Sequence, residues 1–295
     1  MLFIRTSPRL ISFRFRYLST SRSLPRDVPI LPNTSISTFR GQAFHPSKPA
    51  LLPRSHFLSL PATQQWFIST PTTDSSVCQL NYALLEPNSQ FTVPLELIQK
   101  KPSKDGQLTF VQLHAPLKVF LDWTRSPSAA KSSGQNLYLA QAQVMDLSQE
   151  LQAALPTPNF VKEAGRGDVY DTNIWLGLGP TYTPLHRDPN PNLFVQMAGT
   201  KIVRLVEPIL GREIFRRVQT KLGVNASSVF RGEEMMQGKE RELLEEEVWG
   251  MDVDAENFYE TRLGRGDGLF IPKGWWHSLR GIGEGIIGSV NWWFR

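Results

Sequence analysis

The sequence predicts a mainly β fold, a barrel or jelly roll, with flanking and inserted helices. The second half of the chain contains many short apolar runs of strand length, separated by Gly, Pro and Asn residues, and this pattern is typical of barrels and jelly rolls. A stretch of about residues 209–256, between two of these runs, instead has apolar residues at helical spacing and many charged residues. With 295 residues, of which 40% are hydrophobic and 20% charged, the chain can bury one large core or two modest ones.

The first 24 residues have the composition of a targeting segment. Arginines are interspersed with serines and apolar residues, and the first acidic residue is Asp27. The arginines are Arg5, Arg9, Arg14, Arg16 and Arg22. Such a segment is typical of a mitochondrial transit peptide, so we expect a mitochondrial protein of the matrix. Because the segment carries five arginines and no acid, its removal would lower the formal net charge from +5 to zero. A basic tail on a cytosolic or nuclear protein is the alternative.

Residues 25–135 are expected to form an extended lead-in and an accessory α/β segment packed on the core. Residues 25–71 are rich in Pro, Ser and Thr but also hold large apolar side chains, which favours a segment pinned to a core over a free linker. Strands are expected at residues 78–85 and 91–97, and a loop at 126–134. Residues 116–123 have apolar residues at helical spacing after an initial proline, which predicts a helix.

Residues 136–295 are expected to form the β core. Its strands are expected at residues 136–145, 171–178, 183–188, 192–198, 201–206, 258–263, 268–271, 277–280 and 285–293. Helices expected at 211–222 and 232–249 define an insertion of about residues 209–256 between two strands. The second of these helices is rich in glutamate, which is typical of a solvated helix face. The insertion is therefore assigned no chemistry.

Composition excludes several classes of protein. No stretch approaches the ~20 consecutive apolar residues of a membrane-spanning helix, so no membrane span is predicted. The single cysteine, Cys78, cannot form an internal disulfide and lacks the paired spacing of a zinc site. A formal charge near zero after removal of the first 24 residues argues against duplex nucleic acid as a partner, because phosphate binding requires clustered Lys and Arg.

A possible metal site is formed by His186, Asp188 and the distant His277. Alternate side chains of a strand lie on one face, so His186 and Asp188 would project together. A third ligand from another strand would place two imidazoles and one carboxylate on one side of a metal ion. This is the ligand set of non-haem Fe(II) oxygenases, and we expect these three residues to be both metal ligands and catalytic.

The surroundings of these residues resemble a known family. TPLHRD at residues 183–188 is followed by NLFVQMAGTK at 192–201 and by GDGLFIPKGWWH at 266–277. This order is similar to the jumonji C (JmjC) branch of the cupin superfamily, and within it to the asparaginyl-hydroxylase-like cupin-8 group, over roughly residues 49–295. The resemblance implies a double-stranded β-helix, with Fe(II) as the metal, 2-oxoglutarate as the co-substrate and O2 as the oxidant.

The resemblance also implies roles for single residues. His186, Asp188 and His277 match the iron ligands of the family. Three residues match positions that bind the distal carboxylate of 2-oxoglutarate, namely Lys201, Thr183 and Tyr138. Two further residues match polar positions of the co-substrate or metal pocket, namely Asn192 and Asn291.

Lys201 can also be interpreted from physical chemistry alone. In a strand it shares a face with Val203 and Leu205, and an ammonium buried among apolar residues without an anion would cost several kcal/mol. A dicarboxylate bound at one end to the metal and at the other to Lys201 would satisfy it. The alternative is a lysine at the strand end that reaches water.

The remaining pocket residues leave alternatives open. Thr183 precedes the first ligand histidine by three residues, so a straight strand would point it away from the site, whereas a bend at Pro184 would bring its hydroxyl in. Tyr138 could equally be an ordinary core tyrosine. Asn192 could equally shape a turn, because it follows a proline. Asn291 lies among aromatic residues, and a buried amide must find hydrogen-bond partners.

The candidate metal ligands and the resemblance together imply an Fe(II)- and 2-oxoglutarate-dependent hydroxylase of a protein side chain. An RNA base or a small metabolite is an alternative substrate, and a histone-type demethylase is an alternative that the neutral charge disfavours. A metal-binding cupin-fold interaction protein without turnover is an alternative from another class, as is a non-oxidative cupin that uses Mn or Zn. The sequence indicates no oligomeric state.

Overall fold

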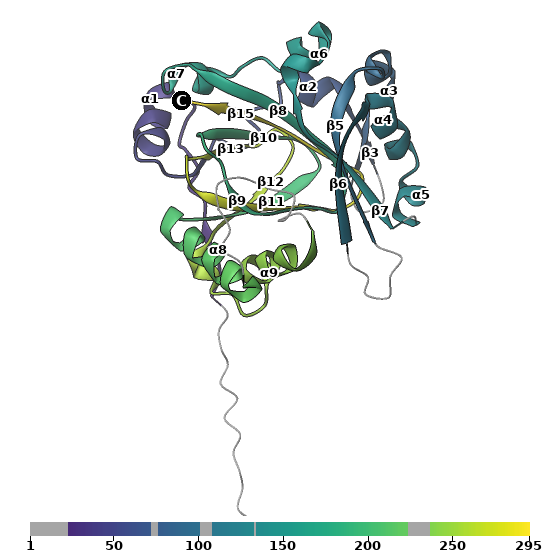
Figure 1. Ribbon diagram of the computed structural model, residues 1–295. Coiled ribbons are helices and arrows are strands. Elements are labelled where there is room, and N and C mark those ends of the chain that lie inside the picture. Colours follow the sequence, from purple (N-terminus) through teal and green to yellow (C-terminus); the bar gives the residue numbers. More distant parts are fainter. Residues whose placement is uncertain (1–22, 72–75, 101–107, 133, 224–236) are drawn as a thin grey trace, which may run out of the picture.

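The computed structural model describes residues 23–71, 76–100, 108–132, 134–223 and 237–295. From residue 169 onward the described chain forms two antiparallel sheets (Figure 1). Their strands are β8 (Val169–Leu178), β9 (Thr181–Arg187), β10 (Asn192–Ala198), β11 (Thr200–Val206), β12 (Tyr259–Leu263), β13 (Gly268–Ile271), β14 (Trp276–Ile282) and β15 (Ile286–Phe294). The order is β13-β10-β15-β8 in one sheet and β12-β11-β14-β9 in the other. The chain crosses between the sheets at nearly every connection, which confirms the predicted jelly roll.

Apolar side chains pack together in part of the space between the two sheets. Phe194 and Leu269 come from the larger sheet, and Val203, Leu205 and Leu279 from the smaller one, and all are buried. On β11 and β14 these residues alternate with outward-facing ones, as the two-residue period of a strand requires. Each side chain on the inner face of a strand therefore reaches the interior of the barrel.

The N-terminal part of the chain extends both sheets. The short strands β1 (Arg26–Asp27) and β2 (Ala50–Leu51) add to the edges formed by β12 and β13. On the other side of the larger sheet, β7 (Gln135–Gln143), β5 (Thr92–Lys100) and β6 (Leu108–Pro116) continue beyond β8. A separate hairpin pairs β3 (Phe67–Pro71) with β4 (Ser76–Leu80).

Short helices cover this extended sheet. They are α1 (Ile36–Phe39) with the π-helical turn Arg40–Phe44, α2 (Pro61–Gln65), α3 (Tyr82–Leu85), α4 (Leu117–Arg125), α5 (Pro127–Ser132), α6 (Gln149–Ala153) and α7 (Asn159–Glu163). Large buried side chains join them to the strands in one apolar cluster that includes Phe39, Trp66, Phe120 and Trp292. Burial of such side chains contributes about 1.5–3 kcal/mol each.

Three expectations for the N-terminal half are wrong in detail. Residues 25–71 are not simply extended, because Ser35 accepts a hydrogen bond from the backbone of Thr38 and starts α1. The strand expected at 78–85 ends at Leu80, and the following residues form α3. The loop expected at 126–134 contains α5, which begins at Pro127, a residue favoured in the first turn of a helix. The helix expected after Pro116 is confirmed as α4.

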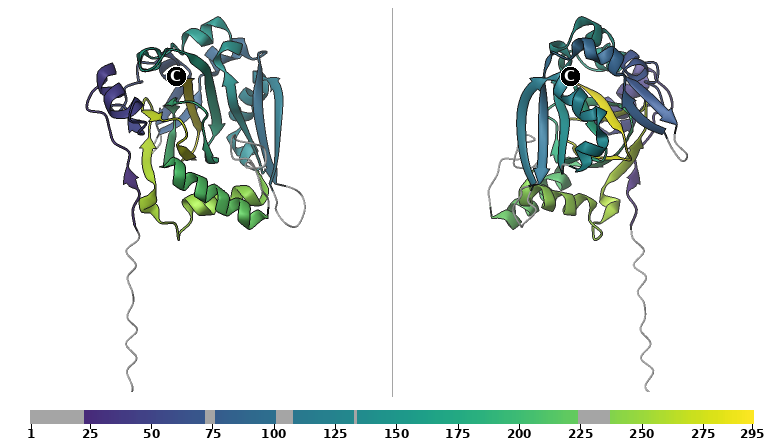
Figure 2. Two further views of the ribbon diagram at one scale, coloured as in Figure 1. Left: turned by 60° about the vertical axis from the view of Figure 1, so that its left-hand side comes forward. Right: turned by 90° about the vertical axis from the view of Figure 1, so that its right-hand side faces the viewer.

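The predicted insertion consists of α8 (Pro208–Leu222) and α9 (Gly238–Trp249), between β11 and β12. Part of the second predicted helix, residues 232–236, lies outside the described residues. Figure 2 shows both helices packed beside the strands at one end of the molecule. At Gly211 of α8 a Cβ atom would lie 2.2 Å from Cδ1 of Trp276, so the helix contacts the smaller sheet directly through this glycine.

Among the described residues, no helix combines the length and the apolar character that crossing a membrane would require.

Candidate metal centre

His186, Asp188 and His277 converge in the structure. One possible ligand atom from each lies within 4.8 Å of those of the other two. The two histidines are direct cross-strand partners on β9 and β14, and their ring centroids are 4.2 Å apart. Asp188 follows the last residue of β9 rather than lying within the strand as expected, and its Oδ2 is 3.6 Å from Nε2 of His277. Within the described ranges this is the one group of three such residues close enough to hold a metal ion.

Backbone carbonyls orient both imidazole rings. The Nδ1 of His186 lies 2.9 Å from the carbonyl oxygen of Pro184, and the Nδ1 of His277 lies 3.3 Å from that of Trp275. An Nδ1–H that donates to a carbonyl leaves the lone pair on Nε2, which is the form that binds a metal. The Nδ1 contact of each ring therefore makes Nε2 the atom that would coordinate a metal ion.

Asn192 orients the carboxylate. Its Nδ2 donates a 2.7 Å hydrogen bond to Oδ2 of Asp188, and both side chains are buried. Its Oδ1 is also buried and has no hydrogen-bond partner in the described part of the chain. Asn192 is the first residue of β10, so it does more than shape the turn after Pro191. Its Nδ2 contacts a candidate metal ligand, and its Oδ1 offers a hydrogen-bond acceptor beside that contact.

A cavity of about 360 Å³, including space open to solvent, adjoins the three residues. It is lined by His186, Asp188 and His277, and by Tyr138, Trp175, Thr183, Asn192, Phe194, Lys201, Leu279, Asn291 and Trp293. All eight residues singled out from the sequence therefore border one cavity. The structure brings together residues that are as far as 153 positions apart in the chain, Tyr138 and Asn291.

Lys201 is buried deep in this cavity, with 3% of its surface exposed. Its ammonium donates to Oγ of Ser289 at 2.9 Å and to the hydroxyl of Tyr138 at 3.4 Å. It also lies 5.1 Å from the ring centre of Phe194. The side chain points into the barrel rather than reaching water, so the alternative of a surface lysine is wrong. A buried ammonium among hydroxyl groups is suited to an anionic ligand.

Thr183 lies on the same side as His186 despite the odd spacing. The pairing of β9 with β14 shifts by one residue, because Ser278 alone opposes both Pro184 and Leu185. Such a β-bulge places one extra residue in a strand. Thr183 then pairs with Leu279, and both residues line the cavity.

Asn291 meets the expectation for a buried amide only in part. Its Oδ1 accepts a 2.6 Å hydrogen bond from Nε1 of Trp175, while its Nδ2 is buried without a hydrogen-bond partner among the residues described. Trp175 and Ser289 were not predicted from the sequence. Ser289 could have been found, because it lies two residues before Asn291 on a strand and therefore shares its face.

The residues present fit the groups that the resemblance implies. Two imidazoles and one carboxylate suit a divalent first-row metal such as Fe(II). Lys201, Tyr138 and Thr183 line the same cavity and Ser289 contacts Lys201; they offer an ammonium and three hydroxyl groups, which suit a carboxylate. The unpartnered amide atoms of Asn192 and Asn291 border the same space and are suited to a polar ligand.

A second cavity, of about 1040 Å³ including space open to solvent, shares Tyr138 with the first. It lies between β5, β7, the start of β9 and helix α9, and it contains Glu96, Tyr182, Arg241 and Arg280. Glu96 is a carboxylate with only 4% of its surface exposed. No pattern in the sequence selects Glu96.

The fold and the site together define a cupin with a candidate metal centre. The cupin-like domain matches residues 62–295, which is most of the chain, and the chain therefore belongs to the cupin-like family that contains the JmjC proteins. The predicted membership of the JmjC and cupin-8 family is confirmed.

Several relatives carry JmjC or demethylase names. Lysine-specific demethylase JMJ30 of Arabidopsis thaliana is 29% identical over 203 residues, which cover 69% of this chain and 42% of that protein. Jumonji C domain-containing protein 5 of Drosophila melanogaster is 26% identical over 272 residues, with coverages of 91% and 60%. Lysine-specific demethylase 8 of Danio rerio is 25% identical over 271 residues, with coverages of 91% and 58%. The chain spans 42% to 60% of the length of these relatives.

Proposed function

We propose that this chain is a JmjC-type oxygenase that depends on Fe(II) and 2-oxoglutarate and hydroxylates a side chain of a protein. The observation that carries the proposal is that candidate metal ligands and a buried ammonium group border the same cavity. His186, Asp188 and His277 meet at one end, and the buried ammonium of Lys201 borders the same cavity. A ligand that chelates a metal and ends in a second carboxylate would satisfy both.

Each residue then has a defined task. When bound, Fe(II) with 2-oxoglutarate would supply the oxidising power, drawn from O2 with loss of CO2, that places an oxygen atom in a C–H bond. His186, Asp188 and His277 would hold the metal from one side and leave its other positions to ligands. Lys201 would bind the distal carboxylate by a charge-assisted hydrogen bond. The indole rings of Trp175 and Trp293 wall the cavity and would limit the access of water.

A protein substrate is supported by the names of the relatives, which include lysine-specific demethylases. These names also favour a second candidate, demethylation of a lysine, which would begin with hydroxylation of a methyl group. The formal charge of zero without residues 1–24 supports the hydroxylase over an enzyme that must engage a nucleosome.

The test combines spectroscopy with product analysis. Anaerobic addition of Fe(II) and 2-oxoglutarate to the purified chain should give a metal-to-ligand charge-transfer band, and air should then release succinate. Mass spectrometry of candidate proteins should show the gain of one oxygen atom for hydroxylation, whereas demethylation should show the loss of a methyl group with formaldehyde. Metal binding without the band or succinate would identify a non-catalytic cupin and refute the oxygenase.

We also propose that residues 1–24 direct the protein to the mitochondrial matrix. The support is their composition alone, with five arginines, no acid and interspersed serines; residues 1–22 lie outside the described part of the structure. A fluorescent fusion of the full chain should enter mitochondria, and a fusion lacking residues 1–24 should not. Import of the shortened fusion would overturn the proposal.

A further inference from the structure

We propose that the inserted helix α9 positions Thr183 in the co-substrate pocket through a chain of two hydrogen bonds, from Trp249 to Ser278 and from Ser278 to Thr183. The inference rests on the proposed function, since it assigns Trp249 and Ser278 as positioning residues for binding of 2-oxoglutarate. It also gives the insertion between β11 and β12 a role in the site.

Strand β9 contains a bulge where it pairs with β14. Arg187 and His186 pair in register with Trp276 and His277, but the next pair in register is Thr183 with Leu279. Leu185 points outward into the apolar cluster beneath α8 and α9, so Thr183 and His186 both face inward with two residues between them. Without the bulge, a three-residue offset would place Thr183 and His186 on opposite faces.

Ser278 stabilises the bulge at the point where β9 departs from regular pairing. Its side chain is fully buried, and its Oγ donates a 2.7 Å hydrogen bond to the carbonyl oxygen of Thr183. The following residue, Pro184, has no N–H group to contribute to the ladder. The hydroxyl of Ser278 therefore fixes the backbone of Thr183 itself.

Trp249, the last residue of α9, completes the chain. Its Nε1 donates a 2.9 Å hydrogen bond to Oγ of Ser278. Because Oγ of Ser278 accepts a hydrogen bond from Trp249, the proton of this hydroxyl is directed to the carbonyl oxygen of Thr183. Hydrogen bonds linked in this way strengthen one another and fix the orientation of a hydroxyl group that could otherwise rotate.

The indole of Trp249 is itself held by two guanidinium groups. Cζ of Arg204 lies 4.5 Å and Cζ of Arg280 lies 4.6 Å from its ring centre. Arg204 also donates to the carbonyl oxygen of Val248 and to Glu260, and Arg280 donates to Glu245 of α9. The end of α9 is thus fixed to the outer face of β11 and β14, which allows it to act on β9.

The position of the bulge predicts whether loss of the hydrogen-bond chain weakens binding of the metal or binding of 2-oxoglutarate. His186 lies beyond the bulge and stays paired with His277, so the metal ligands should keep their positions when the hydrogen-bond chain is broken. Thr183 lies within the affected segment and would lose its fixed orientation. Binding of 2-oxoglutarate should therefore weaken more than binding of the metal.

The experiment uses Trp249→Phe and Ser278→Ala, singly and together. Phenylalanine keeps an aromatic ring beside the two guanidinium groups and removes the N–H donor. Calorimetric titration of 2-oxoglutarate into the Mn(II)-loaded full chain should show affinity lowered by about tenfold in each single variant. Binding of Mn(II), followed by electron paramagnetic resonance, should change by less than about threefold. The double variant should be no weaker than Ser278→Ala alone, because both changes break the same chain.

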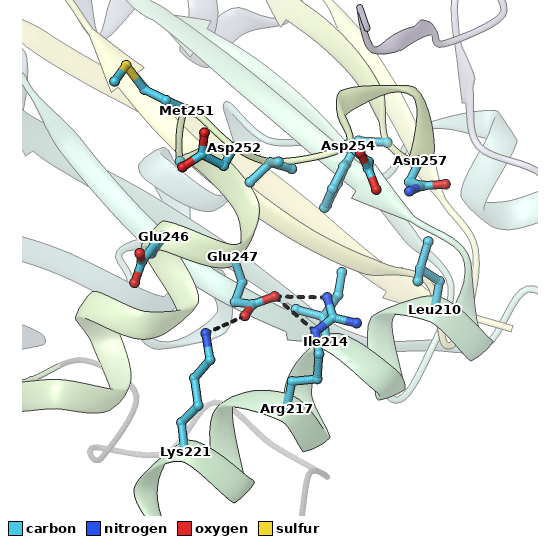
Figure 3. A pocket seen from close by; sticks show the side chains of 13 residues that line it. Leu210, Ile214, Arg217, Lys221, Glu246, Glu247, Met251, Asp252, Asp254 and Asn257 are labelled. Atoms are coloured by element: carbon cyan, nitrogen blue, oxygen red, sulfur yellow. Dashed lines mark hydrogen bonds and ion pairs between the residues drawn. The ribbon is translucent and has the colours of Figure 1, made fainter. Parts of the chain in front are cut away.

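A matched control is Glu247→Gln on the same helix. Glu247 accepts hydrogen bonds from Arg217 and Lys221 of α8 (Figure 3) and makes no contact with Trp249 or Ser278 through these bonds. This variant should lower the melting temperature and leave 2-oxoglutarate affinity unchanged. Unchanged 2-oxoglutarate affinity in Trp249→Phe and Ser278→Ala, multiplicative effects in the double variant, or an equal loss of Mn(II) affinity would overturn the inference. A wild-type chain that binds no 2-oxoglutarate would refute the proposed function as well.

Discussion

Replacement of Lys201 by methionine gives a direct test of the proposed co-substrate pocket. Methionine has a similar length and no charge, so the change removes the ammonium while it keeps the packing. In the structure this ammonium contacts Ser289 at 2.9 Å and Tyr138 at 3.4 Å in a site with 3% exposure. A hydrogen bond from a charged donor contributes about 1.5–3 kcal/mol. The dissociation constant of 2-oxoglutarate should therefore rise by about 10- to 150-fold.

The unfolding free energy of the ligand-free protein should respond in the opposite way. Removal of an ammonium from water costs several kcal/mol even when it has polar partners, and methionine avoids that cost. We therefore expect Lys201→Met to be as stable as the wild type or more stable in thermal unfolding without ligand. A surface change, Lys118→Met, with 56% of the lysine side chain exposed, serves as the control and should change neither quantity.

Calorimetry with the Mn(II)-loaded protein measures the co-substrate affinity, and a separate Mn(II) titration measures the metal affinity. The metal affinity should stay within about threefold of the wild type, because Lys201 does not contact the three candidate ligands through any of its hydrogen bonds given above. An unchanged affinity for 2-oxoglutarate in Lys201→Met would remove this residue from the pocket. A large loss of stability would show that the ammonium serves the fold instead.

Four further changes test other parts of the structure. Asp188→Ala should abolish metal binding and turnover in a metal titration and succinate assay, while circular dichroism stays unchanged; turnover in this variant would refute the ligand assignment. Asn192→Ala removes the 2.7 Å hydrogen bond to Asp188 and should lower metal affinity by about 10- to 100-fold, whereas an unchanged affinity would assign Asn192 to the turn. Gly211→Ala would place a Cβ atom 2.2 Å from Trp276 and should destabilise the protein by about 1–3 kcal/mol in chemical unfolding; an unaffected midpoint would mean that α8 can move away freely. Burial raises the pKa of Glu247, but hydrogen bonds from a lysine and an arginine outweigh burial and bring the pKa below its ordinary value of 4.5. The contribution of Glu247 to stability is therefore complete above pH 4.5 and is lost as the pH falls through the lower pKa of the folded state. Glu247→Gln should accordingly lower the melting temperature at neutral pH and lose its effect in acid.

Most of the barrel could be predicted because its strands are short, apolar and well separated. The runs at 192–198 and 268–271 agree with β10 and β13 at both ends, since each strand is buried on both faces and is bounded by turn residues. Residues 82–85 were assigned to a strand because their apolar content fits either structure. Only the tertiary fold, in which Leu85 joins the main core, decides for a helix.

The three candidate ligands were predictable from residue type, but the position of Thr183 was not. A period of two along β9 places Thr183 on the wrong face, and only the bulge opposite Ser278 corrects this. A bulge depends on the pairing of two strands that are about ninety residues apart in the chain, so Pro184 indicates a bend in the strand but no local pattern locates the bulge. The same reason explains why Trp249 was assigned only to a solvated helix: its partner lies on a distant strand.

The buried charges of the cavity predict that binding of a metal and binding of a dicarboxylate favour each other. Asp188 and Lys201 are both buried and carry opposite charges, so the ligand-free cavity is nearly neutral. A divalent metal ion adds two positive charges and a dicarboxylate adds two negative ones, so only the pair leaves the buried charge unchanged. Each ligand alone would leave an uncompensated charge in a medium of low dielectric constant, where such charges are costly. Binding of the metal should therefore favour binding of the dicarboxylate, and by linkage the dicarboxylate should favour the metal by the same factor.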